Sequence, residues 1–336
     1  MRLLKKNIWI ITLLLWTTSC YDNHESDPIS PTKNNQDQSP VRELGVGSPG
    51  GIPNLGATCY MNAVLQILKA FYLPKIKERN DTLATHIKSL MQVIQDDRDV
   101  ANKAEATAVF KALNTEFGWT TDTGKQADAS ELMQYMFEWM DLPCATIKYR
   151  DIDTKSYKET LNTNPWLIHP IALPDKQNKL IAMQDLFNNS LETESIDVME
   201  AKGVATNTQI KRIPTLENID NLYKGIVVLQ LKRSIFIKER SIRQKRIEKV
   251  QAPLHLAIKK EQTSEKDKDR NYDLAGFIWH TGGVDSGHYI AYINKGNIWM
   301  CYNDNQVRVI SDTEAGARAQ EASLFFYQPS QIRRTT

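Results

Sequence analysis

Cysteine is scarce in this chain, which argues against two kinds of structural site. The sequence has 336 residues and four cysteines, Cys20, Cys59, Cys144 and Cys301, with no C-x-x-C pair. So small a number for this length does not suggest a disulfide framework. Structural zinc sites commonly use paired cysteines, so their absence also argues against such a site. We expect no metal ion and no other cofactor.

The chain also lacks a strong charge imbalance and an apolar run long enough to span a bilayer. The formal net charge is +2, which gives no reason to expect a nucleic-acid partner. The apolar run near the N-terminus, Ile8 to Trp16, is nine residues long. A transmembrane helix needs about 20 apolar residues, so this run is too short to be one.

The first 20 residues are typical of an export signal. Basic residues Arg2, Lys5 and Lys6 precede the apolar run, and small residues 17–19 follow it. The alternative is the start of a buried helix. Ser19-Cys20 resembles the end of a bacterial lipoprotein signal, although Thr17 stands where leucine is usual. We therefore expect a protein exported from the bacterial cytoplasm. It is either anchored to a membrane through lipidated Cys20 or secreted.

Composition divides the rest of the chain into a tether and one domain. Residues 21–50 are rich in Asn, Asp, Gln, Ser, Pro and Gly, and cannot bury enough apolar surface to order themselves. Residues 51–330 form the domain. Its first part, about 51–143, shows helical periodicity, and the part from 144 to 330 is dominated by strands. This order predicts an α+β fold.

The expected elements follow from apolar spacing. Helices are expected at Cys59–Tyr72 (closed by Pro74), Leu83–Ile94, Ala104–Leu113 and Ala129–Met140. Strands are expected within Lys224–Arg233, Tyr272–His280, His288–Ile293 and Asn297–Tyr302, with short strands in Ala145–Pro214. The basic stretch Lys232–Lys249 is interpreted as the solvated face of a hairpin, opposite an apolar set that includes Ile242 and Ile247, rather than as a site for an anionic partner.

Cys59 is the candidate nucleophile. It follows the turn Gly56–Thr58 at the start of the first helix, where the helix dipole favours the thiolate. A cysteine in this position is, taken alone, more often a small buried apolar residue. Asn54 precedes it on the same turn, and its amide could stabilise an oxyanion, although a turn residue is the simpler interpretation.

His288 is the candidate base. It follows Gly287 at the start of a predicted strand, and a cysteine nucleophile needs such an imidazole nearby. Asn303 and Asp304 end the next predicted strand. If that strand turns back antiparallel, the pair lies beside His288 and can orient its ring.

Four ordered motifs then resemble one family. Gly51–Asn62 is similar to the cysteine box of the ubiquitin-specific proteases, papain-like deubiquitinases of peptidase family C19. Tyr272–Tyr292 with Trp299–Asp304 resembles their histidine box, and Gln126–Leu132 resembles their Gln-x-Asp-Ala-x-Glu segment. Leu229–Arg233 is similar to a palm strand, although Ser234 replaces the usual phenylalanine. The resemblance covers about Gly51 to Tyr327.

The resemblance implies a fold and a set of roles. The fold is papain-like, with a helical thumb and an antiparallel β palm. Many members of the family hold zinc in their fingers with two C-x-x-C pairs, but Leu191–Ile213 has no cysteine here, so we expect short, metal-free fingers. Cys59 is the nucleophile, His288 the base and acid, Asn303 the orienting residue and Asp304 its support, while Asn54 serves the oxyanion. Residues implied to contact ubiquitin, chiefly its basic tail, are Gln126, Asp128, Glu131, Gly287 and Tyr289. His280 is non-catalytic, and Gly282–Gly287 is a gating turn.

The resemblance also implies a partner and leaves alternatives. The partner is ubiquitin or a ubiquitin-conjugated protein, and the protein is expected to be a monomer. An export signal on such an enzyme indicates a bacterial protein that acts on ubiquitin of a host cell. The alternatives are a ubiquitin-binding module with negligible turnover, and a papain-like protease for peptides or for another ubiquitin-like modifier.

Overall fold

The computed structural model describes residues 50–94, 101–118, 122–174, 180–199, 205–237, 241–264, 266, 268–284 and 286–330. The expected export signal, Cys20 and all but the last residue of the expected tether lie outside the described residues. Within the described ranges, none of the helices has both the length and the apolar character needed to cross a membrane.

The helices come first, as predicted. The structure has α1 (Cys59–Ile67), a π-helical turn (Leu68–Tyr72), α2 (Leu73–Lys77), α3 (Thr82–Val93), α4 (Lys103–Phe117) and α5 (Ala129–Trp139). Polar side chains cap three of them. Asp81 accepts from Ala84 N at the start of α3, Asn102 and Glu105 form a capping box on α4, and Asp128 caps α5.

Pro74 does not close the first helix, so that prediction is wrong. The helical chain continues to Lys77, and Pro74 lies in the first turn of α2. Proline is tolerated there because the first N–H groups of a helix have no partner within it. The chain instead changes its winding earlier, at the π-helical turn Leu68–Tyr72.

An eight-stranded sheet forms the palm. Its order is β15-β14-β13-β12-β16-β7-β3, with β11 also paired to β12, and the only parallel pair among these is β3 with β7. The strands are β3 (His169–Ile171), β7 (Val227–Leu231), β11 (His255–Ile258), β12 (Arg270–Gly282), β13 (Gly287–Lys295), β14 (Ile298–Asn303), β15 (Gln306–Ile310) and β16 (Leu324–Pro329). The strands predicted around the histidine box are therefore confirmed.

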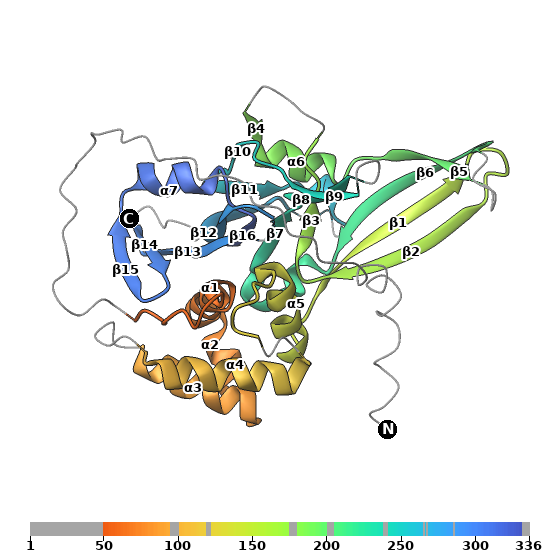
Figure 1. Cartoon of the computed structure of the whole chain (residues 1–336). Coiled ribbons are helices and arrows are strands. Elements are labelled where there is room, and N and C mark those ends of the chain that lie inside the picture. The colour runs from red at the N-terminus through yellow and green to blue at the C-terminus, as the bar shows by residue number, and fades with distance from the viewer. Residues whose placement is uncertain are drawn as a thin grey trace. The chain divides into compact units, whose positions relative to one another are not determined.

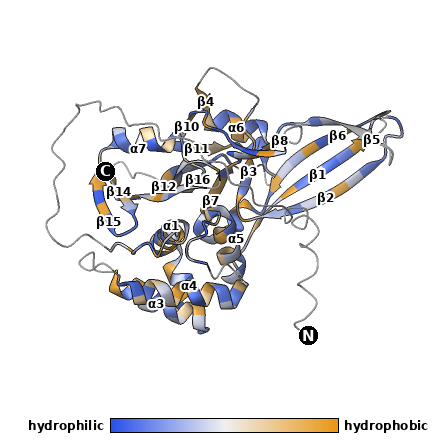
Figure 2. Cartoon of the chain, viewed as in Figure 1, coloured by the Kyte–Doolittle hydropathy of each residue, from blue (hydrophilic) through white to orange (hydrophobic). Residues whose placement is uncertain are grey.

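A second, four-stranded sheet with the order β2-β1-β6-β5 corresponds to the fingers. It contains β1 (Ala145–Asp153), β2 (Glu159–Trp166), β5 (Glu194–Met199) and β6 (Ala205–Glu217). Figure 1 shows it extending away from α3 and α4, and Figure 2 shows polar and apolar residues mixed along β1 and β6. The prediction of short strands here is wrong for β1, β2 and β6. Pro214 is not a residue that predicts a long strand. It is tolerated in β6 because it lies beyond the residues of β6 that pair with β5.

The basic stretch forms a hairpin, as predicted, from β8 (Ser234–Ile237) and β9 (Ile242–Lys245). Its expected apolar face is only partly covered, since Ile242 and Ile247 are 46% and 80% exposed. The remaining elements are α6 (Met183–Asn189), α7 (Asp312–Ala319), the paired strands β4 (Ile181–Ala182) and β10 (Val250–Gln251), and short 3-10 turns at Ile219–Asn221, Tyr223–Gly225 and Lys260–Gln262.

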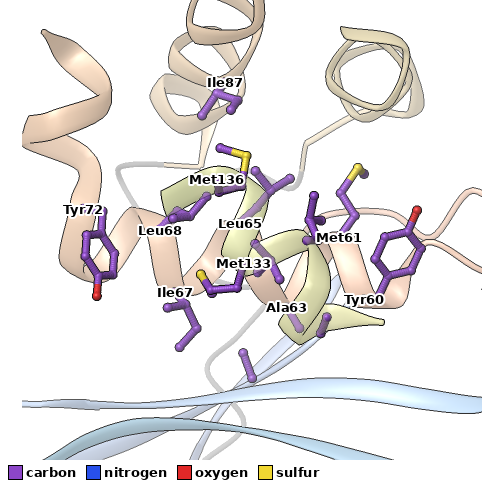
Figure 3. Packing of buried hydrophobic residues seen from close by; sticks show 14 of the residues in the cluster. Tyr60, Met61, Ala63, Leu65, Ile67, Leu68, Tyr72, Ile87, Met133 and Met136 are labelled. Carbon is purple, nitrogen blue, oxygen red and sulfur yellow. The ribbon is translucent and has the colours of Figure 1, made fainter. Parts of the chain in front are cut away.

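The palm sheet separates two apolar clusters, and the cluster on the side of the helices fixes the position of α1. Alternate residues of β13 and β14, such as Ala291 and Tyr302, belong to the cluster of the helices, while Tyr292 and Cys301 belong to the cluster that includes α7. Every residue of α1 is buried. Figure 3 shows Leu65 of α1 beside Met136 of α5, with Ile87 of α3 near them. Helix α1 is thus held between the other helices and the palm.

Candidate active site

Cys59 is the first residue of α1, and its side chain is buried. Its sulfur is in hydrogen-bonding contact with the His288 side chain and the backbone N–H of Tyr289. The amide Nε2 of Gln126 donates to it at 3.4 Å. Burial alone would raise the pKa of Cys59, but these hydrogen bonds outweigh it and the pKa is lowered. The site therefore favours the nucleophilic thiolate.

His288 lies near the start of β13 and is oriented by Asn303, as the sequence predicts. Its Nε2 is 2.5 Å from Asn303 Oδ1, which leaves Nδ1 to face the sulfur. The hydrogen bond with Cys59 raises the pKa of His288 to about 9, although partial burial opposes the rise and Asn303 and Asp304 support it. A lowered thiol pKa beside a raised imidazole pKa favours transfer of the thiol proton to the imidazole, and so a thiolate–imidazolium pair.

Asp304 joins the two ends of the domain. Its carboxylate accepts from Asn54 Nδ2 at 3.0 Å and from Asn62 Nδ2 at 2.7 Å, and it lies 3.7 Å from His288 Nε2. Its backbone carbonyl accepts from Ile52 N at 2.9 Å. The backbone itself is left-handed here, with φ 53°. Asp304 therefore lies beside the histidine and also fixes the segment that precedes the nucleophile, while its role as a support for His288 stays a prediction.

The structure adds Asn62 to the site, a residue to which sequence reasoning gave no role. Asn62 Nδ2 bridges Asp304 and the carbonyl of Ile52, and the side chain is almost fully buried. The available signal was a polar residue three positions after Cys59 on a helix whose neighbouring positions are apolar. A buried amide of this kind needs partners, so it points to a network.

Asn54 organises the turn before Cys59. Its Oδ1 accepts from the backbone N–H groups of Gly56 and Thr58, both at 3.0 Å, while its Nδ2 donates to Asp304. An amide nitrogen carries two hydrogens, so one donor remains beyond the bond to Asp304. The oxyanion role of Asn54 stays a prediction.

Gln126 and Asp128 lie just before α5. Gln126 Nε2 also donates to the carbonyl of Gly287 at 2.9 Å, so one amide touches both the thiol and the gating turn. Asp128 is the N-cap of α5 and accepts from Ser130 N and Glu131 N. Asp128 therefore lies just outside the helix, whereas Glu131 lies in its first turn. Partial desolvation and Asp128 raise the pKa of Glu131. Their contact with a ubiquitin tail stays a prediction.

The gating turn connects β12 to β13, and all of its residues except 285 are described. A Cβ on Gly287 would lie 2.1 Å from Thr281 O and 2.4 Å from His280 Nε2, so only glycine fits. Tyr289 is buried, and its hydroxyl hydrogen-bonds to the N–H of Ala129 at the start of α5. The substrate contacts of Gly287 and Tyr289 stay predictions.

The described residues show no group of three or more His, Cys, Asp or Glu side chains that could hold a metal ion. The three cysteines in the described ranges, Cys59, Cys144 and Cys301, are free. The chemistry that these side chains can carry out by themselves is attack by a thiolate, with proton transfer by the adjacent imidazole.

Comparison with known proteins agrees with this geometry. A family model described as "Ubiquitin carboxyl-terminal hydrolase" matches residues 50–327. The chain is 25% identical to ubiquitin carboxyl-terminal hydrolase 8 of Saccharomyces cerevisiae, over 84% of this chain and 71% of that protein. It is 26% identical to ubiquitin C-terminal hydrolase 12 of Arabidopsis thaliana, over 76% of this chain but only 25% of that protein.

Solved structures share the fold. The SAGA Ubp8/Sgf11/Sus1/Sgf73 DUB module bound to ubiquitin aldehyde contains a chain that superposes with a TM-score of 0.65 at 18% identity, covering 88% of this chain and 72% of that one. A structure of the same module bound to monoubiquitin gives a TM-score of 0.66 at 18% identity, covering 89% of this chain and 72% of that one. The predicted α+β, papain-like fold is thereby confirmed. Because the family match spans most of the chain and includes the cysteine, histidine and asparagine described above, this protein belongs to the ubiquitin carboxyl-terminal hydrolase family.

Proposed function

We propose that the protein is a cysteine-type deubiquitinase that hydrolyses the peptide or isopeptide bond after the C-terminal glycine of ubiquitin. The observation that carries the proposal is the pairing of Cys59 with His288, oriented by Asn303, in a chain that belongs to this family. A nucleophile, a base and a residue that can orient the base lie together, which supports acyl transfer to a thiol.

The reaction follows from the ionisation of the pair. The Cys59 thiolate attacks the carbonyl carbon of the terminal glycine and forms a C–S bond, and the carbonyl π electrons move onto the oxygen. When they return, the C–N bond breaks, and the imidazolium of His288 gives its proton to the departing amine. The neutral imidazole then takes a proton from a water molecule as the oxygen of that water attacks the thioester carbon. The C–S bond breaks, the carboxyl product leaves, and the thiolate and imidazolium are restored.

The groups near the pair fit the handling of a narrow tail. The Gly287 backbone cannot carry a side chain, and Gln126 contacts both the sulfur and that backbone. Asp128 and Glu131 place two carboxylates at the start of α5, where they would meet a basic, extended tail. A terminal Gly-Gly would pass such a channel because it has no side chains.

A ubiquitin probe with a C-terminal electrophile tests the proposal. We expect covalent labelling of the wild-type protein and turnover of ubiquitin-aminomethylcoumarin. Cys59→Ala should lose both while still binding ubiquitin, and Cys144→Ala, which removes another free cysteine, should keep both. Hydrolysis at the wild-type rate by Cys59→Ala would overturn the proposal. Labelling only by probes built on another ubiquitin-like protein would reassign the substrate.

We also propose that the protein is a bacterial one, exported from the cytoplasm, that acts on conjugates of a host cell. The support is the pattern of residues 1–20 together with a ubiquitin-type site. The relatives named above are eukaryotic and lend no support to this origin. Radiolabelled palmitate, supplied to the producing cell, distinguishes a lipoprotein anchored through Cys20 from a secreted enzyme. An uncleaved N-terminus on protein retained in the cytoplasm would contradict both.

We further propose that the catalytic domain acts as a monomer. All the site groups described above come from one chain. Light scattering of the purified protein should give the mass of a single chain of 38.4 kDa, less any cleaved signal. A mass of twice that value would contradict this proposal without affecting the assignment of the reaction.

A further inference from the structure

Lys245 makes an unusual set of contacts at the end of the basic hairpin. It is the last residue of β9, and its ammonium donates to three acceptors at the end of β12. The acceptors are His280 Nδ1 at 3.1 Å, the carbonyl of His280 at 2.8 Å and the carbonyl of Gly282 at 2.9 Å. An ammonium has three N–H donors, so these contacts use all of them. A solvated surface lysine does not behave this way.

These acceptors lie opposite the catalytic strand. In the pairing of β12 with β13, His280 faces Tyr289, Thr281 faces His288, and Gly282 faces Gly287. The His280 ring stacks on Tyr289, with centroids 4.2 Å apart and an interplanar angle of 29°. The backbone N–H of Tyr289 hydrogen-bonds to the Cys59 thiol. A short chain of contacts therefore leads from the ammonium of Lys245 to the reacting sulfur.

The lysine also fixes the form of the His280 ring. An ammonium can only donate, so Nδ1 must accept and the ring proton must sit on Nε2. Burial, with Lys245 adding to it, lowers the pKa of His280 to about 4, so the ring is neutral. Its Nε2 lies against Gly287, within 2.4 Å of where a Cβ would stand. The ring thus sets the position of the residue just before His288.

The gating turn is consequently anchored at both ends. Lys245 holds the carbonyl of Gly282, and Gln126 holds the carbonyl of Gly287. Among the strands that the structure describes, β8 and β9 pair only with each other, so Lys245 joins their hairpin to the palm sheet. We propose that Lys245 is a positioning residue for hydrolysis: its ammonium fixes the base of the gating turn and thereby keeps His288 and the Tyr289 N–H aligned on the Cys59 sulfur.

This inference rests on the proposed function, and Lys245→Met tests it. Lys249→Met is the matched control, because it removes the same charge from the same segment. The Lys249 side chain forms a surface ion pair with Glu321, at 3.9 Å. Losing charge-assisted hydrogen bonds at a positioned strand should lower kcat for ubiquitin-aminomethylcoumarin about tenfold, with KM changed less than about twofold. Lys249→Met should leave kcat unchanged.

A second readout separates positioning from simple stabilisation. The pH midpoint for alkylation of Cys59 by iodoacetamide should rise in Lys245→Met, because the Tyr289 N–H no longer holds the thiolate as firmly. A merely structural role would lower the melting temperature without moving that midpoint beyond the shift seen in Lys249→Met. Amide hydrogen exchange between Thr281 and Tyr289 should also quicken.

The outcomes are distinct. If Lys245→Met matches Lys249→Met in kcat and in alkylation midpoint, the inference is wrong. If Lys245→Met does not fold, Lys245→Arg decides, since a planar guanidinium cannot direct three bonds from one nitrogen. We then expect kcat to fall about threefold for the arginine variant, and a wild-type value would overturn the inference. A wild-type protein that neither labels nor hydrolyses would instead refute the proposed function.

Discussion

Asp304→Asn is the most informative single change, because it keeps the shape of the side chain and removes its charge. In the wild-type protein the carboxylate accepts from Asn54 Nδ2 and Asn62 Nδ2 and lies 3.7 Å from His288 Nε2. The substituted asparagine has only one acceptor oxygen, and its NH2 group would face the NH2 group of either Asn54 or Asn62. One of the two bonds is therefore lost, and the other loses its charge assistance.

The magnitude follows from these bonds. A hydrogen bond to a charged group contributes about 1.5–3 kcal/mol, and a neutral one about 1 kcal/mol. Losing one and weakening the other should cost about 2–4 kcal/mol of unfolding free energy. For a domain of this size that corresponds to a fall of roughly 5 °C in Tm. The Asp304 side chain is only 13% exposed, so solvent cannot fully replace the lost contacts.

Catalysis should suffer more than stability. The pKa of His288 should fall, because Asp304 is one of the groups that raise it, and the turn around Asn54 should loosen. We expect kcat for ubiquitin-aminomethylcoumarin to drop by roughly 100-fold, since misplacement of about 1 Å can cost that much. The assay is steady-state kinetics with a parallel thermal melt.

Asp273→Asn is the control for this prediction. Asp273 also contacts a histidine, His255, at 2.6 Å, but that histidine is 78% exposed. The pair lies toward the start of β12, whereas the site lies at the end of that strand. Neutralising Asp273 should change the unfolding free energy by less than about 0.5 kcal/mol and leave kcat unchanged. Equal behaviour of the two variants would refute the idea that Asp304 ties the nucleophile segment to the histidine strand.

Three further predictions concern pH and metal. Hydrogen bonds lower the pKa of Cys59 and raise the pKa of His288 to about 9. We therefore expect kcat/KM to rise with pH below the ordinary thiol range and to fall as pH passes about 9, where His288 loses the proton that it gives to the leaving amine. A profile that climbs steadily past pH 10 would contradict the ion pair. In the fingers, Arg212 lowers the pKa of Asp151 through bonds of 2.8 and 2.9 Å, so Asp151→Asn should lower the unfolding free energy by about 1–2 kcal/mol at pH 7. Because the pKa of Asp151 is lower in the folded protein than in the unfolded one, its carboxylate stabilises the fold at pH values above the unfolded pKa. This stabilisation is lost as the pH falls through the folded pKa. Denaturant titrations should therefore give the wild-type protein and Asp151→Asn the same unfolding free energy in acid. EDTA should leave ubiquitin hydrolysis unchanged, and loss of activity that only added zinc restores would contradict the expectation of metal-free fingers.

The sequence predicts where the groups of the site lie because each belongs to a short local motif. A turn followed by helical spacing places Cys59 at a helix start, and two strands joined by a tight turn place His288 near Asn303, while their roles were implied by the family resemblance. Antiparallel pairing then brings the histidine and the asparagine together with no long-range information.

The supporting network was not predictable in the same way. Asn62 and Asp304 are 242 residues apart, and nothing local indicates that they meet. Lys245 looked like part of a solvated face because its acceptors are backbone carbonyls and a ring on another sheet. The strand β2 was hidden by its polar residues, since a strand exposed on both faces has no alternating apolar pattern.

The close contact between Gly51 and Asn305, just after β14, bears on when the Cys59 thiol becomes reactive. A side chain on Gly51 would collide with the backbone of Asn305, so the segment before Cys59 packs directly against the last third of the polypeptide. In an unfolded chain the Cys59 sulfur lacks the hydrogen-bonding groups that lower its pKa in the folded site. Less of it is then thiolate, so we expect peroxide to oxidise Cys59 more slowly before folding than after it.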